Sequence, residues 1–297
     1  MSCTYIFLII HISFQITNFA ARNKRLNISK ENIMENTSNG SANINAAEVA
    51  EFILDAGVFL MASGAHSGRV WRNCRRIAEH WGYRMNFNPT FTGILVSVWD
   101  DKDSENAVTR YKTAPANVVH LATLTQISHL SWKIADNEIE YDDARRELET
   151  IKQKAAYPFW LVALAVGISC GCLCTLAGGN LIDAALTFCG ASAGSVARYF
   201  ILKKQFNLFI SIIIASFITT LIVGTDTIFG WGQAPEMTLA TSVLYLIPGV
   251  PLINSVIDLL EGYFSASIAR SLFAASILSS IAVGMILSIM LLGINNF

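Results

Sequence analysis

The second half of the chain, residues 157–297, carries almost no charge. Its basic residues are Arg198, Lys203, Lys204 and Arg270, whereas most charged residues lie within residues 46–156. Of the 297 residues, 14% are charged, and the mean hydropathy is +0.46. These values are typical of a membrane protein and are unusual for a soluble globule of this length.

Five apolar runs divide this second half. Each is close to the roughly 20 residues that a helix needs to cross a hydrocarbon core, although the third is short. The sequence therefore predicts a bundle of about five transmembrane helices. On these bounds Asp226 falls in the loop after the third run, and Asp183 and Arg198 fall inside the second. The five predicted spans are residues 159–177, 181–202, 208–223, 237–260 and 268–292.

Basic residues predict how the spans are oriented. They precede the first span and lie between the second and third and between the fourth and fifth, whereas the other two loops have none. The positive-inside rule then places residues 46–156 in the cytoplasm and the C-terminus outside the plasma (inner) membrane. Arg198, at the inner end of its span, is expected to reach toward the interface.

The polar region, residues 46–156, is predicted to form a cytoplasmic α+β domain. Helical periodicity runs from residue 46 to a stop at Gly82, with a break at residues 63–68. Residues 90–100 and 106–113 read as strands around a charged turn, and residues 118–139 and 141–155 as helices. Residues 1–45 have the composition of a disordered or dispensable tail, and an alternative start lies at Met34.

Composition argues against several classes of function. A net charge of −1 gives no electrostatic footprint for nucleic acid. Cys170, Cys172 and Cys174 could suggest a metal site, but Cys172 would project away from the other two on a helix. Small residues at a helix interface explain the run better, so we predict no metal and no cofactor. Phosphate-binding and nucleophile-elbow signatures are also missing from the sequence.

The polar region offers one candidate cluster, in the stretch GAHSGRVWRNCRRIAEHWG. His66 and Arg69 lie at a glycine-bounded turn and could bind an anion or take part in catalysis. The alternative is a solvated basic helix face that forms weak surface pairs.

The stretch LIPGVPLINSVIDLLEG, residues 246–262, lies within the fourth predicted span. Pro248 and Pro251 each lack an N–H donor and disfavour a helical conformation at the preceding residue. The helix should therefore break near the middle of the membrane. Freed backbone groups are tolerated there only when they are buried in protein or line a cavity.

Polar residues follow the predicted break at helical spacing. Asn254, Asp258 and Glu261 lie at i, i+4 and i+7, and Arg270 is the nearest basic residue for Asp258. A charge within a span usually faces a bundle interior or a substrate path, and the N-terminus of a half-helix can receive an anion. The alternative is a proline hinge with a polar cytoplasmic end. Asp183 is a weaker candidate because it can cap its own helix.

These motifs resemble those of the threonine/serine exporter (ThrE) family. Residues 246–262 followed by Arg270 are similar to its PGxPLxNxxxDLxxG...R signature. Residues 64–82 stand where the family has a G-x-x-(T/S)-x-R-V...R-I-A...G segment, with His66-Ser67 in place of a common Glu-Thr pair. The resemblance covers about residues 46–297.

The resemblance implies an exporter of small carboxylate-bearing metabolites, either threonine and serine or a dicarboxylate such as succinate. Because the chain ends after five spans, it is similar to the split form of the family. The implied partner is a second small membrane subunit, in a hetero- or homo-oligomer.

The broken span and its polar face lead us to a hypothesis about residues of the fourth and fifth spans. Pro248, Gly249 and Pro251 would open the helix, and Asn254 would bind substrate or backbone. Asp258 and Arg270 would form a gating or proton-coupling pair. Two other classes stay open: a membrane-tethered enzyme or sensor, and a structural assembly subunit.

Overall fold

A computed structural model describes residues 44–100, 107–115, 120–153 and 157–294 of the chain. The tail predicted for residues 1–45 lies outside the described residues, except for its last two positions. Asn45, the last of them, caps the first described helix, α2. Of the charged turn predicted at residues 100–105, all but Asp100 also lies outside the described residues.

Two helices begin the polar region, α2 (Ala46–Ala62) and α3 (Ser67–His80). The Asn45 side chain and Glu48 form a capping box at the start of α2, which provides partners for N–H groups that a helix leaves free. Between the helices Gly64 has φ +98°, a conformation that side-chain-bearing residues rarely adopt. The predicted break between the two helices is therefore present and depends on a glycine.

Three antiparallel strands form one sheet in the order β1–β2–β3. They are β1 (Tyr83–Pro89), β2 (Gly93–Asp100) and β3 (Ala107–Thr113). Strand β1 was not predicted from the sequence, because its residues YRMNFNP include no β-branched side chain. Pairing with β2 instead stabilises this strand, with Phe87 opposite Val96.

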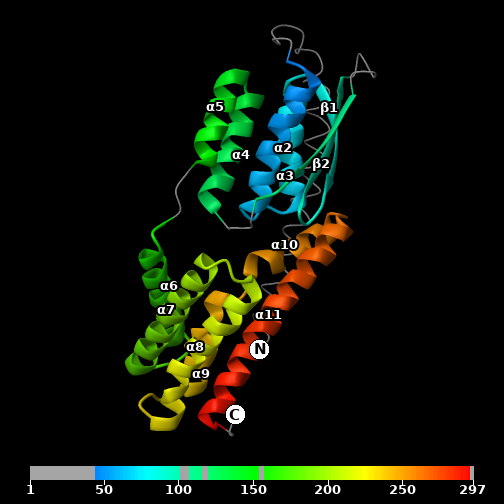
Figure 1. Cartoon of the computed structure of the whole chain (residues 1–297). Helices are drawn as coiled ribbons and strands as arrows, with labels where there is room; N and C mark the ends of the chain where they lie inside the picture. Colours follow the sequence, from blue (N-terminus) through cyan, green and yellow to red (C-terminus); the bar gives the residue numbers. More distant parts are fainter. Residues whose placement is uncertain (1–43, 101–106, 116–119, 154–156, 295–297) are drawn as a thin grey trace, which may run out of the picture. The chain divides into compact units, whose positions relative to one another are not determined.

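The polar region is layered, with α2 and α3 between the sheet and a pair of helices, α4 (Leu121–Ala135) and α5 (Tyr141–Lys152) (Figure 1). Alternate residues of β2 face α2 and are fully buried, whereas Leu95 between them is exposed. The largest buried side chains of this core are Ile53, Leu60, Ile77, Ile94, Ile127, Leu130, Ile134 and Leu148.

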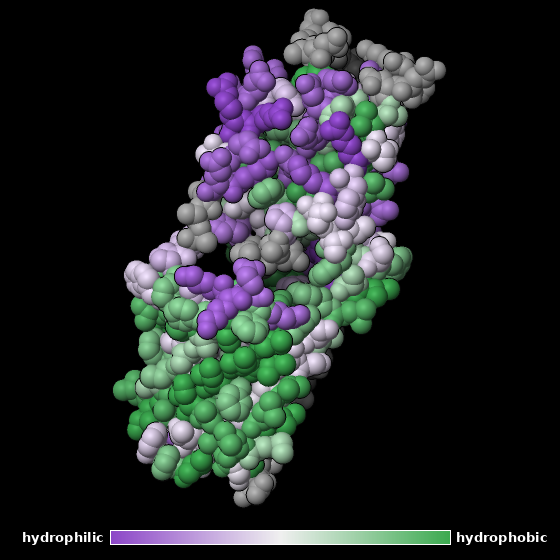
Figure 2. Space-filling view, in the orientation of Figure 1, coloured by the Kyte–Doolittle hydropathy of each residue, from purple (hydrophilic) through white to green (hydrophobic). Residues whose placement is uncertain are grey.

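Among the described residues, the apolar region has four helices long and apolar enough to cross a membrane: α6 (Phe159–Leu176), α7 (Leu181–Lys203), α8 (Leu208–Phe229) and α11 (Phe264–Leu292). Two further segments, Pro235–Leu246 and Gly249–Leu260, are bent by 66° relative to each other. If this bent pair is one span, the number of candidate spans is five. The first part consists of α9 (Pro235–Ser242) and η1 (Leu244–Leu246), and the second is α10 (Gly249–Leu260). Hydrophobic surface covers these helices, and hydrophilic surface gathers over α2–α5 (Figure 2).

The third span is longer than its predicted bounds, residues 208–223. Because α8 continues to Phe229, Asp226 lies within the helix and is buried, so its predicted place in a loop was wrong. The helix passes through Gly224, whose missing side chain leaves room for Leu292. The polar residues after residue 223 are typical of a loop, which is why the predicted span ended there. In the structure, packing against neighbouring helices keeps this segment helical.

Small residues let the helices of the apolar region approach closely, as is common in membrane bundles. Gly167 and Gly171 of α6 face α7, Gly190 of α7 faces α8, and Gly284 of α11 faces α8. Cys170 and Cys174 are buried on α6, and Cys172 is exposed. The cysteine run thus lies on the same helix as this glycine interface.

Candidate functional site

The candidate site lies where the fourth span breaks. Ile247 is extended and Pro248 caps α10 without a side-chain hydrogen bond, so the helix axis changes direction between η1 and α10. Pro251 falls in the first turn of α10, where its missing N–H removes no helical bond. The two prolines therefore end one helix and begin the next.

Asp258 lies on the buried face of α10 and has no exposed surface. The backbone N–H of Ser67 donates to Asp258 Oδ1 at 2.8 Å, and the Ser67 hydroxyl is 3.1 Å from Asp258 Oδ2. Ser67 is the first residue of α3. A carboxylate therefore lies at a helix N-terminus, where free N–H groups and the helix dipole favour negative charge.

Arg270 of α11 forms an ion pair with the same carboxylate. Its Nε lies 3.3 Å from Asp258 Oδ2, and one of its terminal nitrogens donates to the Ala65 carbonyl at 3.3 Å. Asn254 of α10 donates to the Gly64 carbonyl at 2.9 Å. Three polar residues of the broken span and its neighbour thus bind a single loop of the polar region, residues 64–67.

Glu261 extends this contact beyond the end of α10. It lies 3.1 Å from His66 Nδ1 and 3.0 Å from a terminal nitrogen of Arg72. Burial by itself would raise the pKa of Glu261, but the hydrogen bonds from His66 and Arg72 outweigh it and lower the pKa. A side chain at Gly68 would collide with this carboxylate, so the glycine permits the contact.

The side chains of His66, Asp258 and Glu261 lie close enough together to hold a metal ion, with ligand atoms within 4.8 Å of one another. The charges around them do not fit one. Arg270 and Arg72 already pair with the two carboxylates, and a cation would be repelled by both guanidinium groups. We therefore assign no metal to this cluster.

A cavity of about 220 Å³ opens beside the break. The polar side chains that line it are Arg198 of α7, Tyr245 of η1, Asn254 and Arg270, and the described lining contains no carboxylate. Arg198 and Arg270 both line the cavity, so two guanidinium groups can pair with an anion that enters it. The Nε of Arg198 itself is buried and has no hydrogen-bond partner among the described residues. The apolar and backbone lining comes from Met61, Ala62, Gly64, Phe91, Leu208, Ile212, Leu246, Ile247, Pro248, Val250, Pro251, Phe273 and Ile277.

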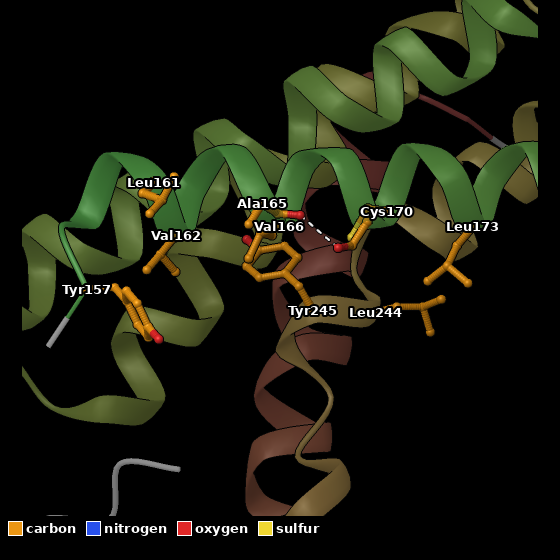
Figure 3. A pocket seen from close by; sticks show the side chains of 10 residues that line it. Tyr157, Leu161, Val162, Ala165, Val166, Cys170, Leu173, Leu244 and Tyr245 are labelled. Carbon is orange, nitrogen blue, oxygen red and sulfur yellow. Dashed lines mark hydrogen bonds between the residues drawn. The ribbon is translucent and has the colours of Figure 1, made fainter. Parts of the chain in front are cut away.

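A larger groove of about 490 Å³ lies between α6 and η1 (Figure 3). Its lining is almost entirely apolar, and the Ser169 hydroxyl there donates to the Ala165 carbonyl of its own helix. This groove offers no guanidinium group to a carboxylate, although Tyr245 reaches both spaces. The chemistry of the site therefore belongs to the smaller cavity.

The structure brings only some of the predicted site residues together. Pro248, Pro251, Asn254 and Arg270 line the cavity, and Asp258 pairs with Arg270. The other candidates lie as follows: Gly249 begins α10 with open space at its α-carbon, Arg69 donates to Ser128 of α4 instead of entering the site, and Asp183 caps the start of α7.

Sequence reasoning missed Ser67, Tyr245 and Arg198 as members of the site. Arg198 was expected to reach toward the interface, and in the structure it lines the cavity and its Nε is buried. Arg198 lies on the same face of α7 as Asp183 and the glycines at 190 and 194. This pattern could have predicted that Arg198 faces the interior of the bundle.

A family model described as "Putative threonine/serine exporter" matches residues 51–292 of the chain. The chain belongs to the threonine/serine exporter family. The match extends over the loop of residues 64–67, the broken span and Arg270. The site is therefore built within the part of the chain that defines the family.

Among curated proteins, the chain is similar to the "Probable succinate transporter subunit YjjP" of Klebsiella aerogenes, with 26% identity over 75% of this chain and 85% of that protein. The protein of the same name from Escherichia coli is also 26% identical, over 75% of this chain and 86% of the relative. A "Probable threonine/serine exporter" of Mycobacterium tuberculosis is 24% identical over 79% of this chain and 44% of the relative. No solved structure matches this member of the exporter family.

Proposed function

We propose that this chain is a subunit of a secondary exporter and that the cavity beside the helix break binds a small carboxylate-bearing metabolite. The observation that carries the proposal is that two arginines, Arg198 and Arg270, line one cavity whose described lining contains no carboxylate. A guanidinium group binds a carboxylate through charge-assisted hydrogen bonds. Membership of an exporter family and the printed names of the relatives support transport as the activity.

The charges that line the cavity favour a dicarboxylate over threonine or serine. Two arginines can bind two carboxylates, whereas the lining offers the ammonium group of an amino acid no negative charge to balance its own. Asp258 already pairs with Arg270 and with Ser67, and it does not line the cavity. Two relatives match this chain over most of their own length, and both are named as probable succinate transporter subunits. Their names support the same substrate class.

The polar region would act as the inner wall of the cavity. Met61, Ala62 and Gly64 line it, and the Gly64 and Ala65 carbonyls bind Asn254 and Arg270. A substrate carboxylate that bound Arg270 would compete with the Ala65 carbonyl for the same guanidinium group. Movement of the loop of residues 64–67 would then open one end of the cavity while α10 stays in place.

Three further features belong to this proposal. The polar region would lie in the cytoplasm and the C-terminus outside the plasma membrane, as the distribution of basic residues indicates. A second membrane subunit would complete the exporter, which is supported by the word "subunit" in the names of two relatives. The chain would act in transport and not as an enzyme.

Transport in proteoliposomes tests the proposal. The chain, a candidate partner subunit and both together are reconstituted, and uptake of labelled succinate and of labelled threonine is measured in each case. Arg198→Gln should reduce succinate transport about tenfold or more, the value of one or two lost charge-assisted hydrogen bonds. Lys204→Gln is the matched control, because Lys204 is exposed just beyond the end of the same helix.

Two outcomes would contradict the proposal. Equal succinate transport by Arg198→Gln and Lys204→Gln would show that the cavity does not bind the substrate. Absence of transport by the wild-type pair, with either substrate, would show that export is not its activity.

A further inference from the structure

Two buried carboxylates lie near the start of α7 and the end of α8, far along α7 from the arginine-lined cavity. Asp183 belongs to the first turn of α7 and is fully buried, and Asp226 belongs to the last turn of α8 and is 1% exposed. Both approach Gly232, in the turn that follows α8. The two acidic side chains are thus neighbours, although 43 residues separate them in the sequence.

Each carboxylate uses one oxygen and leaves the other without a partner. Asp183 Oδ2 accepts from the backbone N–H groups of Asn180 at 2.8 Å and Gln233 at 3.3 Å. Asp226 Oδ1 accepts from the Gly232 N–H at 2.6 Å. Asp183 Oδ1 and Asp226 Oδ2 are buried and have no donor among the described residues. A buried acceptor without a donor is costly, so these two oxygens require an explanation.

The two unpartnered oxygens face the same point. A side-chain carbon placed on Gly232 would lie 2.6 Å from Asp226 Oδ2 and even closer to Asp183 Oδ1. The oxygens are therefore no more than about 5 Å apart, a separation at which two buried negative charges repel strongly. The backbone of Gly232 covers both of them, which leaves little room for a metal ion and its ligands.

No described basic side chain compensates the pair. The nearest basic residue along α7 is Arg198, fifteen residues further, or roughly 22 Å along a helix. The last turns of α8 and α11 contain no basic residue. Cys174 of α6, which is buried, lies beside Gly179 together with Asp183. The acidic residue of the first turn of α9 is Glu236, and the Thr238 hydroxyl of α9 donates to the Ala234 carbonyl.

We propose that Asp183 and Asp226 share one proton and form a proton-binding site of the apolar region. Binding a proton from water forms one O–H bond on one carboxyl group and reduces the charge of the pair from two negative charges to one. The new O–H can donate to the unpartnered oxygen of the other carboxylate. Paired acidic side chains hold a proton in this way when both cannot be charged at once.

The site lies on the same face of α7 as the arginine-lined cavity. Thr187, Gly190, Gly194 and Arg198 follow Asp183 at intervals of three or four residues, and the buried hydroxyl of Thr187 has no partner in the part of the chain that the structure describes. If the proposed export occurs, proton binding at one end of this face can influence anion binding at the other. The proton site itself stands whether or not the chain is an exporter.

Infrared difference spectroscopy of the purified full chain in lipid vesicles tests the site. The wild type should show the carbonyl band of a buried carboxylic acid at neutral pH, shifted in heavy water and lost at alkaline pH. Asp183→Asn and Asp226→Asn should each remove this band. Glu236→Gln is the control and should retain it.

The asparagine variants are expected to fold. In Asp226→Asn the amide oxygen can still accept from the Gly232 N–H, and the amide nitrogen can donate to Asp183 Oδ1. The midpoint of thermal unfolding should therefore equal or exceed that of the wild type. Asp226→Leu has a similar size but no donor, and it should unfold at a lower temperature because it leaves the Gly232 N–H and the Asp183 oxygen unpaired.

Several results would overturn the proposal. These are a wild-type spectrum without the acid band at neutral pH, a band that survives in both asparagine variants, or a band that follows sodium or potassium concentration instead of pH. Proteoliposome transport separates this proposal from the previous one. A retained acid band without any transport would contradict the exporter and leave the proton site standing.

Discussion

The backbone N–H of Ser67 lies 2.8 Å from Asp258 Oδ1, across 191 residues of sequence. The contact joins the N-terminus of α3 in the polar region to a fully buried carboxylate of the broken span. Arg270 binds the other oxygen of the same carboxylate. Asp258 therefore links the polar region to the apolar region through Ser67 and Arg270. A change in its charge should affect both regions.

Asp258→Asn is expected to abolish export and to preserve membrane insertion. The asparagine side chain has nearly the same size but cannot compensate the charge of Arg270, which would then be held by carbonyl oxygens alone. Export is measured in proteoliposomes, and insertion is measured by protease protection in membranes. Glu236→Gln serves as the control, because it also removes one acidic charge from the apolar region. Unchanged export by Asp258→Asn would exclude a role for the Asp258–Arg270 pair.

A double-mutant cycle measures the contact between Ser67 and Asp258. Ser67→Ala removes the hydroxyl that lies 3.1 Å from Asp258 Oδ2 and keeps the backbone donor, so it should lower the free energy of unfolding by about 1 kcal/mol. Combined with Asp258→Asn, the effects should be non-additive by about 0.5 kcal/mol or more. Chemical unfolding of the full chain in detergent gives these values. Additive effects would mean that the two side chains act independently.

Close packing of α11 on α8 gives a prediction about Gly284. A methyl group there would meet the backbone of α8 at Ile213 and Phe217 and the side chain of Ser216. Gly284→Ala should therefore lower the free energy of unfolding by about 1 to 3 kcal/mol, because a helix backbone cannot move aside as a flexible side chain can.

The matched control is Gly249→Ala. Gly249 begins α10 and nothing lies within 4 Å of an added methyl group. Thermal unfolding of both variants in the same detergent compares them directly. Equal stability of the two variants would show that α8 and α11 are not in close contact at Gly284.

Residue patterns predicted the helices of the polar region and the break in the fourth span, because periodicity, glycine and proline act locally. Patterns could not predict β1, whose sequence has low strand propensity and which forms by pairing with β2. The prolines could be recognised because they interrupt an apolar helical run. Asp258 and Arg270 could be recognised because charged residues are rare in such a run. Ser67 occupies the (T/S) position of the motif in residues 64–82, but its contact with Asp258 could not be predicted, because the partner is 191 residues away.

The last prediction concerns Asp55 of α2, which connects three elements of the polar region. Its carboxylate binds Lys112 of β3 and Lys152 of α5, the latter at 2.7 Å. Burial alone would raise the pKa of Asp55, but the hydrogen bonds and charges of the two lysines outweigh it and hold the pKa below its ordinary value of 3.8. A lowered pKa means that the folded state favours the charged form. This stabilisation is present above about pH 4 and is lost as pH falls through the folded-state pKa.

Asp55→Asn should therefore lower the free energy of unfolding by about 1 to 3 kcal/mol at neutral pH, since charge-assisted hydrogen bonds to two lysines are lost. The difference from the wild type should shrink as the pH falls below about 4, because the unfolded carboxyl group is protonated first and the folded one becomes neutral only as the pH passes its lowered pKa. Unfolding of the full chain is followed by circular dichroism over this pH range. Asp143→Asn is the control, because Asp143 forms an exposed pair with Arg146 on one helix and should contribute little at any pH. A difference between Asp55→Asn and the wild type that stays constant across the range would mean that the carboxylate charge does not stabilise the fold.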